Sequence, residues 1–174
     1  LLTYRWEVHR KLIHVSSSTI AILLWYFGKD VFLPWLLATA IIFLILDYLR
    51  RYILFLKQLY FRLFGMITRP DEYEILSGAS WVFLGAGFTV YLFDENIAIV
   101  AILVMSLSDS AAAIIGIKYG STLLFNKSLE GTLAFLITTF VIIRIFSPAS
   151  LILTLIATIV ATIVELVSPS KLND

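Results

Sequence analysis

The segment VMSLSDSAAAIIGIKYGS, residues 104–121, places an acidic side chain, Asp109, in an apolar run that begins at Ile97. A charged residue inside such a run is costly and usually faces a cavity or a partner, so Asp109 serves either a functional site or a structural ion pair. On a helix, the Ala and Gly residues at 112, 113, 116 and 120 lie near the face of the acid. Small side chains there either leave room for a polar ligand or let two helices pack closely.

A second polar segment, NKSLEGT at 126–132, stands where a helix is expected to begin. Lys127 and Glu130 are three residues apart and can share a helix face. The free N–H groups of a helix N-terminus suit phosphate, Lys127 adds a positive charge, and Glu130 can hold a divalent ion that bridges phosphates. The alternative is a surface Lys–Glu pair with ordinary capping by Asn126 or Ser128.

The segment HRKLIH at 9–14 adds two cations, Arg10 and Lys11, and the imidazole of His14. The cations are either phosphate ligands or juxtamembrane anchors. His14 lies one turn from them, so it either enters the same site or is an ordinary residue near a helix end.

Four carboxylates fall near the same ends of the apolar segments: Glu74, Asp109, Glu130 and Glu165. Oxygen-rich sites with waters and phosphates are typical of Mg²⁺. The candidate general bases are Asp109, Glu74 and His14. The chain has no cysteine, which excludes thiol chemistry. His9 and His14 are its only histidines, and they do not form a two-histidine arrangement suited to zinc. It also has no Walker A sequence.

The elements that must position these groups are membrane-spanning helices. The 174 residues are 60% hydrophobic and 14% charged, whereas soluble domains have about 25% charged residues. We therefore expect an all-α integral membrane protein, a single domain over residues 1–174. A span takes about 20 mostly apolar residues. Six segments approach that length: 12–27, 31–49, 75–93, 97–115, 131–147 and 150–167.

Two further segments do not resemble spans. Residues 50–69 mix cations with aromatic residues and leucines, which predicts an amphipathic helix on the membrane surface. The alternative is an extension of the second span. Residues 116–130 are rich in Gly, Ser, Asn and Lys and are expected to form a polar loop.

The distribution of basic residues predicts the orientation. With six spans and a cytoplasmic N-terminus, 11 of the 13 basic residues face the cytoplasm: Arg5, Arg10, Lys11, Arg50, Arg51, Lys57, Arg62, Arg69, Lys118, Lys127 and Lys171. Such a bias sets topology. The candidate groups then face the cytoplasm together.

The ordered motifs RKLIH, LSGAS, SDSAAAIIGIKYG, NKSLEGT and a terminal E…LND resemble the CTP-dependent lipid kinases, that is, dolichol kinase, phytol kinase and the yeast-type diacylglycerol kinase. They are more distantly similar to the phosphatidate cytidylyltransferases, whose terminal signature is absent here. The resemblance covers most of the chain. Its most specific part is D-x-x-A-x-x-x-G-x-x-x-G followed by K-S-x-E-G-T.

The resemblance implies a site for CTP and Mg²⁺. Its nucleotide and phosphate ligands would be Arg10, Lys11, Gly116, Gly120, Lys127, Ser128, Gly131 and Thr132. Its metal ligands would be Asp109, Glu130, Glu165 and Asp174. We expect the chain to stop inside the family's C-terminal acidic motif.

The predicted function is therefore transfer of the γ-phosphoryl group of CTP to the hydroxyl of a membrane lipid alcohol, such as a polyprenol, dolichol, phytol or diacylglycerol. The expected partners are CTP, this lipid and the bilayer, with no nucleic acid, and the small-residue faces allow a homodimer. Two alternatives remain, a cytidylyltransferase that acts on a lipid phosphate and an ion or proton transporter that uses Asp109.

Overall fold

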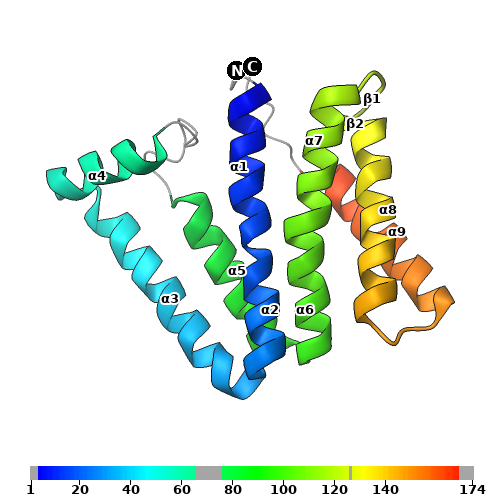
Figure 1. The fold of residues 1–174 in the computed structure, drawn as a ribbon, viewed down its shortest axis with the longest axis horizontal. Coiled ribbons are helices and arrows are strands. Elements are labelled where there is room, and N and C mark those ends of the chain that lie inside the picture. Colours follow the sequence, from blue (N-terminus) through cyan, green and yellow to red (C-terminus); the bar gives the residue numbers. More distant parts are fainter. Residues whose placement is uncertain (1–3, 66–75, 126, 169–174) are drawn as a thin grey trace. The chain divides into compact units, whose positions relative to one another are not determined.

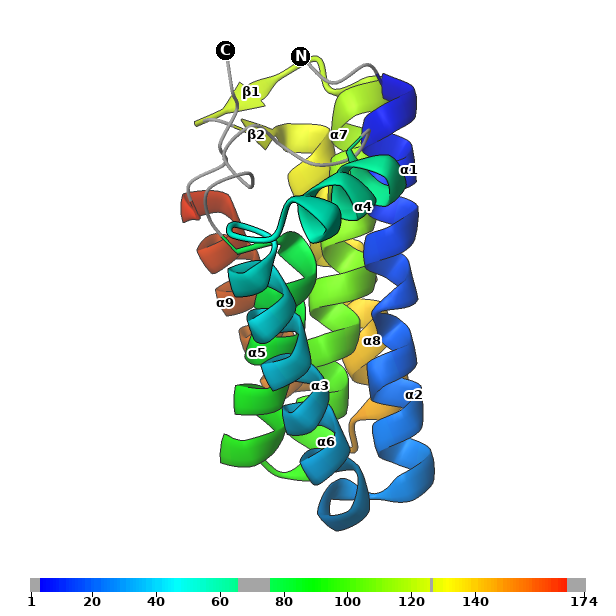
Figure 2. The same cartoon turned by 90° about the vertical axis from the view of Figure 1, so that its left-hand side faces the viewer.

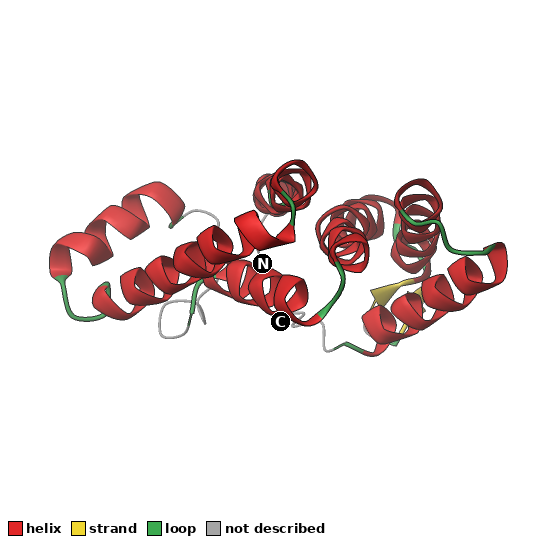
Figure 3. Ribbon diagram, turned by 90° about the horizontal axis from the view of Figure 1, so that it is seen from below, coloured by secondary structure: helices red, strands yellow, loops and turns green. Residues whose placement is uncertain are grey.

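The computed structural model describes residues 4–65, 76–125 and 127–168, with side chains from residue 8 onward. These residues are almost wholly helical, with one short two-stranded hairpin (Figure 3). The predicted all-α class is confirmed. The chain divides into two compact units, of which unit 1 comprises residues 1–21 and 99–174 and unit 2 comprises residues 22–98.

Three helices in the described chain are long and apolar enough to cross a membrane: Lys29–Leu49, Glu95–Tyr119 and Leu129–Phe146. Two shorter apolar helices are Gly78–Leu92 and Leu151–Val167. These five helices coincide with five of the six predicted spans and support an integral membrane protein. The count of six spans stays a prediction.

The segment predicted as a single span at 12–27 consists of two helices, α1 (Tyr4–Ser16) and α2 (Ser18–Phe27), which meet at Ser17. The hydroxyls of Ser16 and Ser17 each donate to the carbonyl oxygen three residues earlier, at 2.6 Å. Serine hydroxyls that bond the backbone compete with the helical hydrogen bonds, and this explains the interruption.

Unit 2 is built on the packing of α3 (Lys29–Leu49) against α5 (Gly78–Leu92). The rings of Phe43 and Phe83 stack between them with centroids 4.8 Å apart. Helix α4 (Leu54–Phe64) follows α3 after a turn and runs in a different direction (Figure 1). The helix predicted within 50–69 is therefore separate from α3 and not its extension, while its place on the membrane surface stays a prediction.

Unit 1 contains the candidate site. In chain order its elements after α1 are α6 (Glu95–Leu103, shared with unit 2), the π-helical turn η2 (Val104–Ser108), α7 (Asp109–Tyr119), β1 (Leu123–Leu124), β2 (Lys127–Ser128), α8 (Leu129–Phe146) and α9 (Leu151–Val167). Helix α8 packs against both α7 and α9, and α1 packs against α7 (Figures 1 and 2).

The prediction of a polar loop over 116–130 is wrong at both ends. Helix α7 continues to Tyr119, and β1 and β2 then form an antiparallel hairpin with Leu123 opposite Ser128. Helix α8 begins at Leu129, because the Ser128 hydroxyl caps it by accepting the N–H of Gly131 at 3.1 Å. The capping alternative proposed from the sequence is thus confirmed for Ser128.

Candidate functional site

A π-helical turn positions Asp109. It occupies Val104–Ser108 and leads directly into α7, whose first residue is Asp109. A π turn holds more residues than an α turn, so each extra residue rotates the next helix by about 100° relative to an uninterrupted α-helix. Such turns occur frequently at functional sites. The buried hydroxyls of Ser108 and Thr139, 3.0 Å apart, join this turn to α8.

Asp109 forms an ion pair with α1. Its Oδ2 lies 2.5 Å from Nζ of Lys11 and 3.5 Å from Nε2 of His14. The Lys11 side chain is 9% exposed, whereas that of Asp109 is 41% exposed. Both of these contacts use Oδ2 of the carboxylate. The structural ion pair left open by the sequence exists, and it still leaves an accessible carboxylate oxygen.

His14 acts as a donor in this arrangement. Its Nε2 lies 3.1 Å from the carbonyl oxygen of Met105, within the π turn. A carbonyl oxygen only accepts, so Nε2 must carry the proton. The histidine therefore helps to orient Asp109 and the π turn. Its Nε2 cannot serve as a base while this bond persists.

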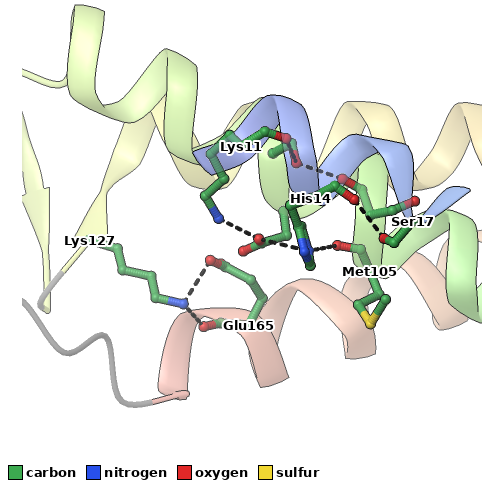
Figure 4. Close-up of polar contacts among 9 residues, drawn as sticks. Lys11, His14, Ser17, Met105, Lys127 and Glu165 are labelled. Atoms are coloured by element: carbon green, nitrogen blue, oxygen red, sulfur yellow. Dashed lines mark hydrogen bonds and ion pairs between the residues drawn. The ribbon is translucent and has the colours of Figure 1, made fainter. Parts of the chain in front are cut away.

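A second ion pair joins β2 to α9. The Nζ of Lys127 lies 2.7 Å from Oε1 of Glu165 and also bonds the backbone carbonyl oxygen of Glu165. That carbonyl belongs to the last turn of α9, where backbone oxygens lack helical partners and cations are favoured. Figure 4 shows the side chains of Lys11, His14, Lys127 and Glu165 in one region of unit 1.

The predicted pairing of Lys127 with Glu130 does not occur. Lys127 lies on the strand before the helix, and Glu130 lies in the first turn of α8. Oε1 of Glu130 accepts the N–H of Ser121 at 3.0 Å and its hydroxyl at 2.5 Å. Glu130 thus holds the end of α7 to the start of α8. The Thr132 hydroxyl donates to the carbonyl oxygen of Ser128 at 3.1 Å.

The predicted glycines lie where α7 and α8 come closest. A Cβ added to Gly116 would be 2.7 Å from the Ser128 hydroxyl, and one added to Gly120 would be 2.7 Å from Cβ of Ser128. A Cβ on Gly131 would be 2.8 Å from the carbonyl oxygen of Ala112. Cβ atoms essentially never approach other atoms this closely, so these glycines permit close packing. Their predicted role in nucleotide binding stays a prediction.

The acidic groups are the candidate ligands for a metal bound to phosphates. Among the described residues, no three His, Asp or Glu side chains come together as a metal site. Two carboxylate oxygens, Oε2 of Glu130 and Oε2 of Glu165, are buried and accept no hydrogen bond within the described chain. Mg²⁺ bound to a nucleotide usually needs one or two carboxylates, and such oxygens suit that role.

Unit 2 holds a buried polar cluster that the sequence analysis missed. Asp47 is 4% exposed. Its Oδ2 accepts the N–H and hydroxyl of Ser77 at 2.7 and 2.8 Å and the hydroxyl of Ser80 at 2.5 Å. Its Oδ1 lies 2.9 Å from Nε of Arg50, whose guanidinium stacks over Tyr60 at 4.0 Å.

The signal for this cluster was present in the sequence. Asp47 interrupts an apolar run in the same way as Asp109, and LSGAS supplies Ser77 and Ser80. The cluster explains that motif, because it fixes the start of α5 to the end of α3 within unit 2.

The remaining candidates lie on α1 or outside the described residues. Arg10 is half-buried on α1, one residue before Lys11. Glu74, Asn126 and Asp174 lie outside the described residues. The structure therefore brings together Lys11, His14 and Asp109, and separately Lys127 and Glu165, within one unit.

Known proteins similar to this chain include the CTP-dependent diacylglycerol kinase 1 of Saccharomyces cerevisiae, with 35% identity over 153 residues, or 82% of this chain and 52% of the yeast protein. The kinase of the same name from Eremothecium gossypii is 32% identical over 134 residues, or 74% of this chain and 42% of that protein. The uncharacterised protein RP860 of Rickettsia prowazekii is 31% identical over 138 residues, covering 78% of this chain and 68% of that protein.

The chain thus spans about half the length of the yeast kinase. No family model and no solved structure matches it. The homology agrees with the family that the sequence motifs resemble. The chain is homologous to CTP-dependent diacylglycerol kinase 1, a member of the CTP-dependent lipid kinase family.

Proposed function

We propose that the protein is a kinase that transfers the γ-phosphoryl group of CTP to the hydroxyl of a membrane lipid alcohol. Diacylglycerol is the first acceptor to consider, because the two fungal relatives are diacylglycerol kinases. The observation that supports this most directly is the presence of two lysine–carboxylate pairs, Lys11–Asp109 and Lys127–Glu165, in one region of unit 1 (Figure 4).

Paired lysines and carboxylates suit a site that alternates between empty and nucleotide-bound states. Without nucleotide, each lysine is neutralised by its carboxylate, since an isolated charge in a largely buried position is costly. When a nucleotide binds, Lys11 and Lys127 can turn to phosphate oxygens. Arg10, on the same helix as Lys11, would add a third cation. Neutralising and positioning phosphates is most of what phosphoryl transfer requires.

Glu165, released by Lys127, and Glu130 would then hold the metal. Glu165 and Glu130 each have a buried carboxylate oxygen without a hydrogen bond in the described chain. Mg²⁺ would neutralise phosphate charge as the leaving group departs. The protein's own contribution is to hold Glu130 through Ser121 and to release Glu165 when Lys127 turns to phosphate.

Asp109 is the proposed base. Its side chain is 41% exposed, and once Lys11 turns to phosphate the carboxylate is available to accept the proton of the acceptor hydroxyl. The hydroxyl oxygen forms a bond to the γ-phosphorus while the bond to the β–γ bridging oxygen breaks and CDP leaves. Glu74 stays an alternative base. We further propose that this site faces the cytoplasm, as the distribution of basic residues predicts.

The experiment uses purified protein in nanodiscs with diacylglycerol, dolichol or phytol and with CTP labelled at either the α or the γ phosphate. We expect the γ label, and not the α label, in the lipid product. Asp109→Asn should lower kcat by about 100-fold or more, because it removes the base. The matched control is Asp30→Asn, an exposed acid in the first turn of α3 in unit 2, which should retain activity.

The possible outcomes separate the alternatives. Transfer of the α label to a lipid phosphate, with release of pyrophosphate, would indicate a cytidylyltransferase. Ion flux into liposomes that depends on Asp109 without nucleotide consumption would indicate a transporter. Full kinase activity in Asp109→Asn would overturn the assignment of the base.

A further inference from the structure

The hairpin between α7 and α8 exposes apolar side chains in an unusual place. Leu123 and Phe125 are 76% and 77% exposed, more than any other large apolar side chain in the described chain. Exposed apolar residues on the helices face lipid and are expected in a membrane protein. These two residues, in contrast, lie on a short connection between two helices that are long enough to cross a membrane.

The backbone at Phe125 is strained. Its φ is 55°, and it is the only residue other than glycine with a positive φ in the part of the chain that the structure describes. This left-handed conformation is unfavourable for a bulky side chain, and hairpin turns normally use Gly, Asn or Asp there. Strained residues persist only where the surrounding structure enforces them, and they cluster at functional sites. Phe125 is largely exposed and makes no ring contact with another described aromatic residue, so packing against the described residues does not explain this conformation.

The residues just before the hairpin indicate what covers it. Helix α7 ends with Lys118 and Tyr119, and the Lys118 ammonium lies 5.0 Å from the centre of the Tyr119 ring. Lysine and tyrosine at the end of a span are typical of the membrane–water interface. The hairpin starts four residues beyond Tyr119, so Leu123 and Phe125 are within reach of the headgroup region and the first acyl carbons.

We infer that the β1–β2 hairpin inserts Leu123 and Phe125 into the interfacial layer of the bilayer. The membrane leaflet itself covers these two side chains. Because Lys127 lies two residues after Phe125 and pairs with Glu165, insertion would hold the Lys127 end of the site at the depth of lipid hydroxyls. Insertion itself does not depend on the proposed kinase activity. Only the role in acceptor delivery rests on it.

The absence of cysteine allows a direct test, since a single introduced cysteine can carry an environment-sensitive NBD label. Phe125→Cys and Leu123→Cys are labelled in phosphatidylcholine nanodiscs with and without a spin-labelled lipid quencher in the upper acyl chain. The control is Thr122→Cys, an exposed polar position next to β1. We expect blue-shifted, strongly quenched fluorescence at 123 and 125 and weak quenching at 122. Equal quenching at the three positions would overturn the inference.

A second variant tests the role of Phe125 in acceptor delivery. Phe125→Gly relieves the positive φ and should raise Tm by about 2–4 °C. It should also raise KM for diacylglycerol in the bilayer about tenfold, with kcat and KM for CTP unchanged, because the buried apolar surface is lost. KM for a short-chain, water-soluble diacylglycerol should not change. An unchanged KM for diacylglycerol in the bilayer would overturn the delivery role. If the wild-type protein shows no kinase activity but the quenching at 123 and 125 is observed, only the proposed function is overturned.

Discussion

The close approach of α7 and α8 at Gly131 can be tested by adding one methyl group. In Gly131→Ala the new Cβ would lie 2.8 Å from the carbonyl oxygen of Ala112, 2.9 Å from the Ser128 hydroxyl and 3.3 Å from Cα of Gly116. Two of these neighbours are backbone atoms that cannot rotate away. The third is the cap of α8, whose hydroxyl is held by its bond to the N–H of Gly131. The two helices must therefore separate by a few tenths of an ångström.

These contacts set the expected cost in stability. Overpacking a closely packed contact costs about 1–3 kcal/mol, and disturbing an N-cap costs about 1 kcal/mol. Replacing glycine by alanine within a helix stabilises the helix by up to about 1 kcal/mol. We therefore expect Gly131→Ala to lose about 1–3 kcal/mol of stability, and Tm should fall by about 2–4 °C per kcal/mol in a chain of this size.

Gly85→Ala is the matched control, because a Cβ at Gly85 would meet no atom within 4 Å. This exposed position on α5 should gain stability or stay unchanged on helix propensity alone. Both variants are unfolded thermally in the same detergent, with fluorescence and circular dichroism as independent probes. If Gly131→Ala is as stable as Gly85→Ala, the glycines do not serve close helix packing and the reasoning fails.

Three further experiments test other parts of the structure. Asp47→Ala leaves a buried guanidinium without its carboxylate and should cost about 3–5 kcal/mol in thermal unfolding, so a loss below about 1 kcal/mol would contradict the buried cluster. A double-mutant cycle of Lys127→Met and Glu165→Gln should give a coupling free energy of about 0.5–3 kcal/mol, and additive effects would show that the pair does not form. Gly28→Ala should be destabilised relative to Gly85→Ala by about 1–2 kcal/mol, because Gly28 has a φ of 76° between α2 and α3; equal stability would argue against that backbone conformation.

Local chemistry explains why the class and most helix positions were predictable. Long apolar segments predict helices in a membrane protein regardless of their partners, and five of the six predicted spans coincide with apolar helices. Ser128 could be recognised as a cap because capping needs only a hydroxyl before the first turn. The break at Ser17 was missed, since a hydroxyl that bonds the backbone within an apolar segment leaves hydropathy almost unchanged.

Partners within the site were less predictable, because they depend on residues far apart in the chain. Spacing alone paired Lys127 with Glu130, whereas the hairpin directs Lys127 to Glu165, 38 residues away. Asp47 was overlooked because its hydrogen-bond donors, Ser77 and Ser80, come from another helix about 30 residues later.

The sequence by itself determined the membrane class, the family and the residue types available for phosphate and metal binding, because these depend on composition and on motifs of fixed spacing. Only the tertiary structure decided how those residues are used. The π turn sets the direction of Asp109, α1 brings Lys11 and His14 to one of its oxygens, and packing of α7 on α8 fills the space beside the glycines with Ser128. The physical reason is that the register of a helix and an ion pair between residues far apart in the sequence depend on the whole packed unit, which no short segment specifies.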